Sequence, residues 1–476
     1  MSDDITSLGA LDLSAAIHAR QVSCTEVMQA YLARIDRLNP GINALISLKS
    51  PETLLADARQ MDELAARGQW LGWMHGMPQA IKDLAATRDI RTTYGSPLYR
   101  DFQPAEDSII VERVRRAGAI VIGKTNTPEF GLGSQSYNPV HGVTRNAYDP
   151  ALCAGGSSGG AAAALAARLL PVADGSDMGG SLRNPAAYNN VFGFRPSAGR
   201  VPKYPVPEAF IEQLGVEGPM GRSVPDVARL LATQAGPDPR APLSRSDDPA
   251  VFALPLEAPM RGLRVGWLGD LEGYLPFEPG ILELCEQGLK ALADIGCEVQ
   301  ASSLGFAPQR LWEMWLTLRS CVVAGGRWDD YADPARRAQM KPEAVWEVER
   351  GRSASALDVY RASKERTAWH RHLLTLFQRF DILVLPTAQV FPFDADQHWP
   401  RTIAGREMDT YHRWMEVVIG PTLAGAPAIS VPVGFGAAGA PMGMQLIGAP
   451  GADLRVLQVA HAYDQATRWV ERRPPL

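Results

Sequence analysis

Hydrophobic and polar positions over about the first 70 residues follow the spacing of helices. Ser23 to Glu26 (SCTE) form a capping box, in which the serine and glutamate side chains satisfy free N–H groups at a helix start. The box predicts a helix that runs to Leu38, where residues 39–41 (NPG) are expected to end it.

The pattern then changes to alternating strands and helices. Residues 76–84 (GMPQAIKDL) and 119–123 (AIVIG) are short apolar runs typical of buried strands. Between them, Asp107 is expected to cap a helix that ends at Ala117.

The second half of the chain repeats this alternation. We expect strands at 262–268, within 296–304, at 380–386, at 428–435 and around Gln445, and helices at about 279–295 and from about 453. Such alternation predicts an α/β fold with a mixed central β-sheet covered by helices on both faces.

Residues 305–420 have a different character. Seven of the 11 tryptophans lie there, at positions 312, 315, 328, 346, 369, 399 and 414. We expect a single domain over residues 1–476, in which 305–420 form a variable, helical, Trp-rich cap that contributes to a substrate pocket.

Composition excludes several classes of function. Hydrophobic residues make up 46% and charged residues 21%, which is ordinary for a globular enzyme, and the net charge of −5 predicts no nucleic-acid partner. The start, MSDDITSL, does not resemble a signal peptide, and the chain holds no long apolar run, so we expect a cytoplasmic protein without a membrane partner. Five unpatterned cysteines predict neither disulfides nor a metal site.

Lysine is rare in this chain. Only seven of the 47 basic residues are lysines, and the other basic positions are arginines. Arginine does not release its proton in a protein, so a lysine inside an apolar run such as MPQAIKDL points to a need for a deprotonatable amine. Lys82 occupies that run. The plain alternative is a lysine at a strand end, paired with Asp83.

Residues 118–125 (GAIVIGKT) match the phosphate-binding pattern GxxxxGK[ST] letter for letter. A phosphate loop requires a strand before the first glycine and a helix directly after the threonine. Here the strand-like run lies between the two glycines, so we do not expect a nucleotide site.

Residues 155–159 (GGSSG) fit the GxSxG pattern of α/β-hydrolases, with His461 as a candidate late base. That pattern requires a hydrophobic strand leading into the serine. The preceding segment 145–154 (RNAYDPALCA) lacks one, so this reading is disfavoured.

Two glycine–serine segments offer a third interpretation. Residues 155–160 (GGSSGG) precede an alanine-rich helix, and residues 175–185 (GSDMGGSLRNP) place consecutive small residues before Ser181. Such residues can turn successive N–H groups toward one point, as an oxyanion hole requires. Spacing alone leaves two solvent-facing loops equally open, and the rare Lys82 favours catalysis.

These segments resemble the amidase signature family of serine hydrolases. GGSSGG and GSDMGGSLRNP are similar to its two hallmark segments, and GMPQAIKD at 76–83 is similar to the segment that carries its catalytic lysine. The resemblance covers about residues 5–235 and 380–470.

The resemblance implies a Ser–Ser–Lys triad. Ser181 would be the nucleophile, Ser157, after a cis peptide bond, would relay its proton, and neutral Lys82 would receive it. The backbone N–H groups of Met178, Gly179 and Gly180 would form the oxyanion hole. Supporting roles fall to Ser158, which would hydrogen-bond within the triad, and to Asp177 and Arg183, which would brace the nucleophile loop as an ion pair.

The same resemblance implies C–N bond hydrolysis without metal or cofactor. The substrate would be a small carboxamide or carbamate (urethane), with a bulky, apolar or aryl body suggested by the tryptophans. For the pocket we name Ser134, Gln135, Trp312 and Trp315, although core packing is an equal reading for both tryptophans. We expect a monomer or homodimer.

An alternative within the family is an A-type component of a tRNA-dependent amidotransferase, which makes ammonia in a complex. That component usually carries a glutamine after the nucleophile-loop arginine and the run KPTYGR soon afterwards. This chain has Asn184 and residues 195–200 (RPSAGR), which argues for a free-standing hydrolase.

Overall fold

A computed structural model describes residues 2–476. The strands are β1 Leu45–Ile46, β2 Pro78–Lys82, β3 Ile120–Thr125, β4 Tyr137–Asn138, β5 Gly142–Val143, β6 Val172–Asp177, β7 Phe192–Arg195, β8 Val216–Gly221, β9 Arg264–Trp267, β10 Glu298–Ala301, β11 Ile382–Pro386, β12 Thr402–Ile403, β13 Arg406–Glu407, β14 Ala428–Phe435 and β15 Pro441–Ile447. The helices are α1 Ser2–Ser7, α2 Ala10–His18, α3 Cys24–Ile42, α4 Pro51–Ala66, α5 Ile109–Arg116, α6 Gly159–Ala166, α7 Arg183–Tyr188, α8 Val224–Gln234, α9 Ile281–Asp294, α10 Pro308–Ala332, α11 Pro334–Arg337, α12 Pro342–Ser353, α13 Ala356–Arg379, α14 Ile419–Ala424 and α15 Asp453–Thr467.

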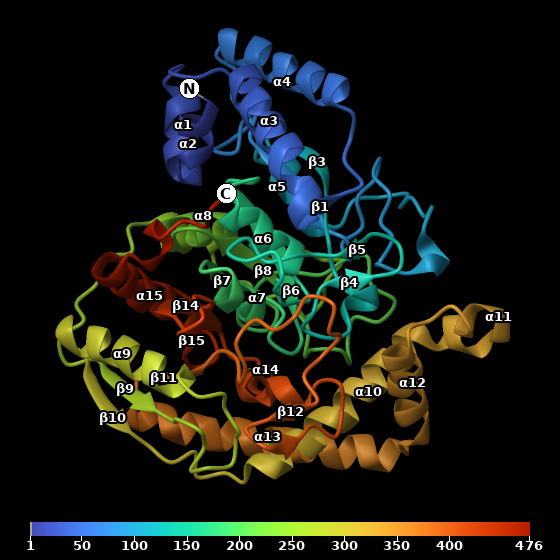
Figure 1. The fold of residues 1–476 in the computed structure, drawn as a ribbon, viewed down its shortest axis with the longest axis vertical. Helices are drawn as coiled ribbons and strands as arrows, with labels where there is room; N and C mark the ends of the chain where they lie inside the picture. The colour runs from blue at the N-terminus through green and yellow to red at the C-terminus, as the bar shows by residue number, and fades with distance from the viewer. Residues whose placement is uncertain (1) are drawn as a thin grey trace.

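An eight-stranded mixed sheet runs through the middle of the molecule (Figure 1). Its strand order is β10-β9-β11-β15-β14-β7-β8-β6. The β10, β9 and β11 strands pair in parallel, and the remaining neighbours pair antiparallel. The predicted mixed α/β architecture is therefore confirmed.

Helices cover both faces of this sheet. Gly443 and Met444 are neighbours on β15, so their side-chain positions point to opposite faces. A Cβ atom on Gly443 would lie 3.0 Å from Ala187 of α7, whereas one on Gly288 of α9 would lie 3.0 Å from Met444. Thus α7 packs on one face of the sheet, and α9 packs on the other.

A separate three-stranded sheet, with the order β1-β3-β2, carries Lys82 at the end of β2. The prediction of strands in this region is confirmed, but they do not join the central sheet. Residues Gly123, Lys124 and Thr125 lie inside β3. No phosphate-binding loop forms at this sequence, because all three residues are held in the strand.

Two predicted helix boundaries are wrong. Helix α3 starts at the predicted Ser23 capping box but runs past Leu38 to Ile42, with Pro40 in its last turn. The N-cap of α5 is Ser108, because the carboxylate of Asp107 instead accepts the N–H of Arg88 at 2.7 Å and pairs with Arg115 at 2.9 Å.

The Trp-rich region is mostly helical, in α10 to α13; in Figure 1, α13 runs along the lower edge of the molecule, and α10, α11 and α12 lie on its right side. Its predicted bounds need correction, because residues 382–386 within it form β11, between β9 and β15 of the central sheet. We therefore propose a cap that consists of helices α10 to α13 only.

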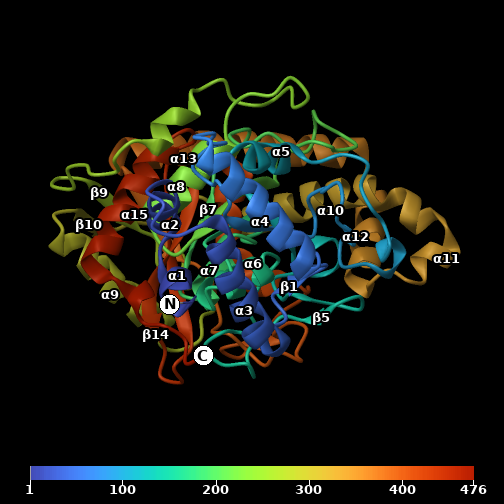
Figure 2. The ribbon, with the colours of Figure 1, turned by 90° about the horizontal axis from the view of Figure 1, so that it is seen from above.

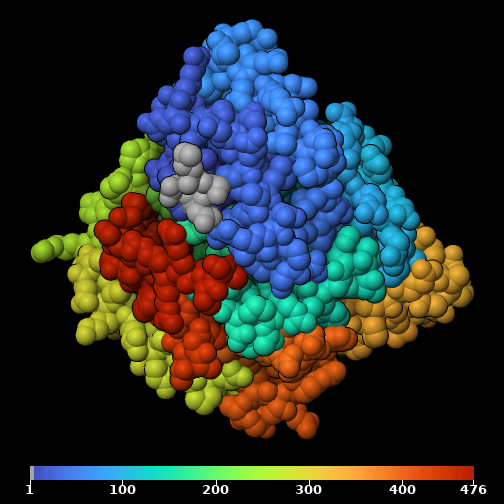
Figure 3. Space-filling view, turned by 45° about the horizontal axis from the view of Figure 1, so that its top comes forward, coloured from blue at the N-terminus to red at the C-terminus, as the bar shows by residue number. Residues whose placement is uncertain are grey.

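The two ends of the chain lie near each other. Seen from above, α1, α2 and α15 lie on the same side of the molecule (Figure 2), and the surface shows the C-terminal segment beside the N-terminal one (Figure 3). The side chain of Arg168 donates to the carbonyl of Ser7 at 2.9 Å, which anchors the first helix. Among the described residues, no helix is long and apolar enough to cross a bilayer.

Candidate active site

Three chain segments converge on one buried point. Lys82 ends β2, Ser157 and Ser158 precede α6, and Ser181 lies in the loop between β6 and α7. The backbone N–H of Lys82 donates to Asp174 on β6 at 3.1 Å, which fixes β2 against the central sheet. The predicted catalytic residues thus come from the end of a strand of the small sheet and from two loops, one of which follows a strand of the central sheet.

The amine of Lys82 is surrounded by hydroxyl groups. Its Nζ atom lies 2.8 Å from Oγ of Ser157, 2.8 Å from Oγ of Ser158 and 3.0 Å from Oγ of Ser176. The side chain is 1% exposed and makes no ion pair with Asp83, whose carboxylate accepts the N–H of Thr93 instead. Ser176 was missed by the sequence analysis, although it stands within the glycine–serine segment that carries Ser181.

Burial lowers the pKa of Lys82 to about 7, while the more distant carboxylates of Asp174, Asp177 and Glu217 act in the opposite direction. Removing an ammonium ion from water disfavours its charged form, and hydroxyl contacts compensate only in part. The neutral amine is therefore populated near neutral pH.

The second buried lysine, Lys124, is held differently. Its ammonium group donates to the carbonyl of Ala85 at 2.6 Å and to the hydroxyl of Thr87 at 2.8 Å. Burial lowers its pKa to about 8. These contacts fix the segment that follows Lys82.

Ser157 follows a cis peptide bond with Gly156, as the family resemblance implies. The hydroxyl of Ser134 donates to the carbonyl of Gly156 at 2.8 Å, and it accepts a hydrogen bond from the side chain of Asn184 at 2.9 Å. The side-chain amide of Gln135 donates to the carbonyl of Ala395 at 2.8 Å.

Neither Ser134 nor Gln135 lines the cavity beside the serines, contrary to our expectation of pocket residues. Both side chains are buried. Ser134 holds the backbone of the 155–158 segment through Gly156, whereas Gln135 bonds to the segment of Ala395.

Ser181 is 7% exposed, and its carbonyl accepts the N–H of Ser158 at 3.2 Å. Among the described residues, the backbone N–H groups of Met178, Gly179 and Ser181 have no hydrogen-bond acceptor. The N–H of Gly180 donates to the carboxylate of Asp177 at 3.0 Å. Gly180 is therefore not free to contribute to the oxyanion hole, contrary to our expectation.

Asp177 and Arg183 form the expected ion pair, and the structure adds a second guanidinium. Arg183 Nε lies 3.0 Å and Arg195 Nη1 3.2 Å from the carboxylate of Asp177, all three side chains being fully buried. Burial alone would raise the pKa of Asp177, but Arg183 and then Arg195 hold it well below its usual range. The role of Arg195 could not be inferred from its place in RPSAGR.

A cavity of about 280 Å³ opens beside Ser157 and Ser181. Its walls are largely apolar, with contributions from Leu84, Phe130, Leu132, Val206, Val216, Val323 and Met415. Polar side chains at the cavity include Ser176, Lys203, Glu217 and Arg319. Glu217 was missed by the sequence analysis, although it is the one charged residue in the strand VEGPMG.

Trp312 and Trp315 do not line this cavity. Both indoles are fully buried and stacked, with ring centroids 5.3 Å apart. A Cβ atom added to Gly179 would lie 3.1 Å from the ring of Trp315. The indole therefore packs behind the nucleophile loop, and the core-packing reading replaces the pocket reading.

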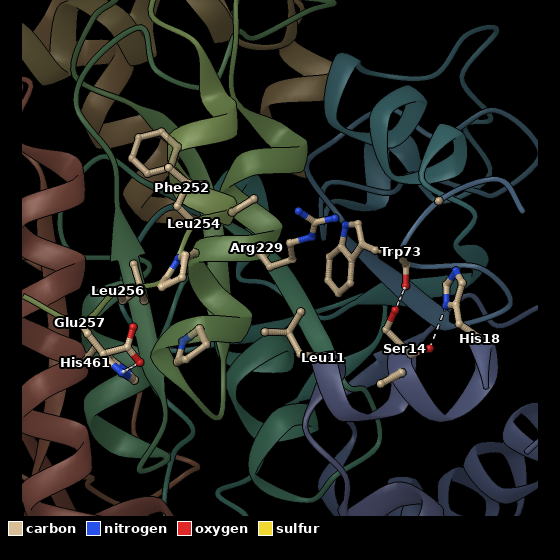
Figure 4. A pocket seen from close by; sticks show the side chains of 16 residues that line it. Leu11, Ser14, His18, Trp73, Arg229, Phe252, Leu254, Leu256, Glu257 and His461 are labelled. Atoms are coloured by element: carbon tan, nitrogen blue, oxygen red, sulfur yellow. Dashed lines mark hydrogen bonds and ion pairs between the residues drawn. The ribbon is translucent and has the colours of Figure 1, made fainter. Parts of the chain in front are cut away.

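A larger groove of about 780 Å³ lies elsewhere, and His461 lines it (Figure 4). The ring of His461 lies 3.7 Å from Glu257, on the side of the groove away from Trp73. Because neither Ser157 nor Ser181 lines this groove, the α/β-hydrolase reading is wrong.

A family model described as Amidase matches residues 26–457. The chain belongs to the amidase signature family. It is 36% identical over 480 residues to the A component of the glutamyl-tRNA(Gln) amidotransferase of Synechococcus sp. (strain CC9605), with 96% of each chain covered. Enzymes of this family act on C–N bonds, and membership assigns this chain to the same general class of enzyme.

Solved structures extend the comparison. A bacterial aryl acylamidase of this family superimposes with a TM-score of 0.91 at 27% identity, covering 98% of this chain and 97% of that one. The A component of the glutamyl-tRNA(Gln) amidotransferase of Thermotoga maritima gives a TM-score of 0.76 at 27% identity, covering 97% and 95%. The fold is therefore that of the amidase signature enzymes.

Replacing Trp315 by alanine should destabilise the protein by about 3–5 kcal/mol, because it removes a large, fully buried side chain and leaves a void. Chemical denaturation followed by fluorescence or circular dichroism measures the change. Trp328→Ala is the matched control, since Trp328 is 46% exposed and its loss should change the unfolding midpoint little. An unchanged midpoint for Trp315→Ala would contradict the packing role.

Proposed function

We propose that this protein hydrolyses the C–N bond of a carboxamide or carbamate through an acyl-enzyme on Ser181. The Ser181 hydroxyl attacks the carbonyl carbon, Ser157 accepts its proton, and neutral Lys82 accepts the proton of Ser157. The relay then runs in reverse to protonate the leaving amine. Water enters, loses a proton along the same path, and releases the carboxylic acid; a carbamate would instead give the carbonic acid monoester, which loses carbon dioxide to leave the alcohol.

The observation that carries this proposal is the contact between Lys82 and Ser157. An Nζ–Oγ distance of 2.8 Å allows direct proton transfer, and a lysine pKa of about 7 supplies the neutral base. Lys124 is buried as well, but its amine donates to the Ala85 carbonyl and the Thr87 hydroxyl. The amine of Lys82 instead contacts Ser157, which lines the cavity beside Ser181, and this position supports the role of a base.

The loop before Ser181 supports the second requirement, which is stabilisation of the oxyanion. The N–H groups of Met178, Gly179 and Ser181 remain available, and the Asp177 carboxylate holds the loop from behind through Gly180. Donors fixed in this way need no rearrangement when negative charge develops on the carbonyl oxygen.

The apolar cavity supports a substrate with a bulky or aryl body. A volume of about 280 Å³ is close to the smaller end of ligand pockets, which fits a compact substrate. The similarity to an aryl acylamidase agrees with this choice. Urethane cleavage follows from the same chemistry, because a carbamate presents the same carbonyl to Ser181.

A second candidate is an A-type component that generates ammonia for tRNA-dependent amidation in a complex. The curated relatives favour it, since two chains that carry this name are each 36% identical to this one over nearly the full length. Asn184 and the RPSAGR segment favour the free-standing enzyme instead.

The two candidates differ in their need for partners. We expect the purified chain to hydrolyse aryl or aliphatic amides alone, and to elute from gel filtration as a monomer or homodimer. Amine or ammonia release from a panel of anilides, aliphatic amides, aryl carbamates and glutamine measures this. Activity restricted to glutamine, and only with tRNA and the other components of an amidotransferase added, would favour the amidotransferase reading.

A fluorophosphonate or sulfonyl fluoride should modify Ser181, because that serine is the nucleophile. Mass spectrometry of the labelled protein locates the adduct, and Ser181→Ala should abolish labelling while leaving the unfolding midpoint near that of the parent. Chelators should leave the labelling rate unchanged. An adduct on Ser157 instead would place the nucleophile in the 155–160 segment and would contradict the proposed role of Ser181.

Replacing Lys82 by arginine should lower kcat/KM by at least about 10²-fold, because a guanidinium keeps its charge but cannot accept a proton. Lys290→Arg on the exposed side of α9 is the matched control and should leave activity unchanged. Circular dichroism verifies that both variants fold. An active Lys82→Arg protein would remove Lys82 from the mechanism and direct attention to Lys124.

The pH profile offers an independent test. The base must be neutral, so kcat/KM should rise as pH increases through the lysine pKa of about 7 and level off above it. A rate that falls over this range would contradict a neutral lysine as the base.

A further inference from the structure

Glu217 lies on the cavity wall next to the proton relay. It stands on β8 directly opposite Ser176 of β6, in the ladder that joins the two strands. Ser176 in turn contacts Nζ of Lys82 at 3.0 Å. The carboxyl group therefore reaches the same cavity as Ser157 and Ser181.

This carboxyl group has no partner among the described residues. Its Oε2 atom is buried without any hydrogen bond, and burial raises the pKa of Glu217 to about 7. A buried carboxylate without a donor is costly, so such groups are normally paired. An unpaired one at a ligand cavity points to a partner supplied by the ligand.

The neighbouring cations already bind other side chains. The ammonium group of Lys203 bonds to Glu212, and Arg319 across the cavity donates to Glu347 at 2.7 Å and to the hydroxyl of Tyr411 at 2.9 Å. Lys82 is neutral in the proposed reaction. Among the described residues, Glu217 thus makes no ion pair, although the more distant charge of Lys203 acts on it.

We propose that Glu217 is a specificity-determining residue that binds a positively charged amino group of the substrate. The inference rests on the proposed function and narrows it to carboxamides or carbamates that carry a protonated amine beside an apolar body. The apolar walls contact the body, and the carboxylate of Glu217 accepts hydrogen bonds from the ammonium group. A neutral substrate would leave that carboxylate desolvated and unpaired.

Two covalent probes of nearly equal shape test this preference. Para-(aminoethyl)benzenesulfonyl fluoride carries an ammonium group, and para-propylbenzenesulfonyl fluoride carries a methyl group in its place. We expect the cationic reagent to modify Ser181 at least about tenfold faster, as the ratio of second-order rate constants followed by mass spectrometry. Each rate is corrected for the reagent's intrinsic hydrolysis.

Glu217→Gln should bring this ratio close to one while the rate with the neutral reagent stays within about threefold of the parent, which verifies that the nucleophile is intact. The control is Glu106→Gln, which removes an exposed carboxylate that accepts from the hydroxyl of Tyr204 at 3.2 Å. It should preserve the ratio, because Glu106 does not line the cavity.

The parent protein also tests the inference by itself. Protonation removes the carboxylate, so the ratio should fall between pH 8 and pH 6, around the Glu217 pKa of about 7. Lys203, Asp174 and Lys82 are the charged or titratable groups that act on this carboxyl. Titration of Lys82 slows both reagents and its charge also acts on the cationic one, so the same pH series on Glu217→Gln, where the ratio should change much less, isolates the contribution of the carboxyl group.

The outcomes separate the two proposals. A ratio near one in the parent protein, or a preference that persists in Glu217→Gln, would overturn the role of Glu217 and leave the mechanism in place. Failure of both reagents to modify Ser181 would overturn the proposed function and, with it, this inference.

Discussion

The carboxylate of Asp177 lies between two fully buried guanidinium groups, and the loop that carries Ser181 is built around that cluster. The same carboxylate accepts the N–H groups of Gly180 and Leu182, at 3.0 and 3.2 Å. Removing one partner from such a cluster leaves an uncompensated buried charge, which typically costs about 3–5 kcal/mol. The nucleophile loop is thus fixed by a charge network whose other members lie on α7 and β7.

Lys82, in contrast to Asp177, is buried without an oppositely charged group in contact. Where Lys203 and Arg319 each contact a glutamate, the amine of Lys82 meets only hydroxyl groups and one carbonyl. Without a carboxylate in contact, desolvation dominates, and the pKa falls to about 7. The site therefore combines a rigid, fully paired ion cluster with a base that is kept neutral by the lack of pairing.

The tryptophans illustrate how tertiary packing redirects a sequence signal. Their concentration in 305–420 suggested an aromatic pocket, yet Trp312 and Trp315 stack on each other and meet His412 edge-on behind the loop of Gly179. Aromatic clustering in a sequence specifies large buried area, but not which face of a helix meets a cavity. Here that area supports the site from behind, and smaller side chains such as Val323 and Met415 line the cavity itself.

The sequence by itself determined the family, the mixed α/β fold and the loops around Ser157 and Ser181, because these depend on local patterns of glycine, serine and apolar residues. It also singled out Lys82, through its rarity in an arginine-rich chain. Only the tertiary structure brought Arg195 and Glu217 to these loops, because both depend on strand pairing such as that of β6 with β8, which no local pattern specifies. Ser176 and the bond from Gly180 to Asp177 are local in sequence, but only the folded geometry shows that Ser176 contacts Lys82 and that the N–H of Gly180 is already bonded.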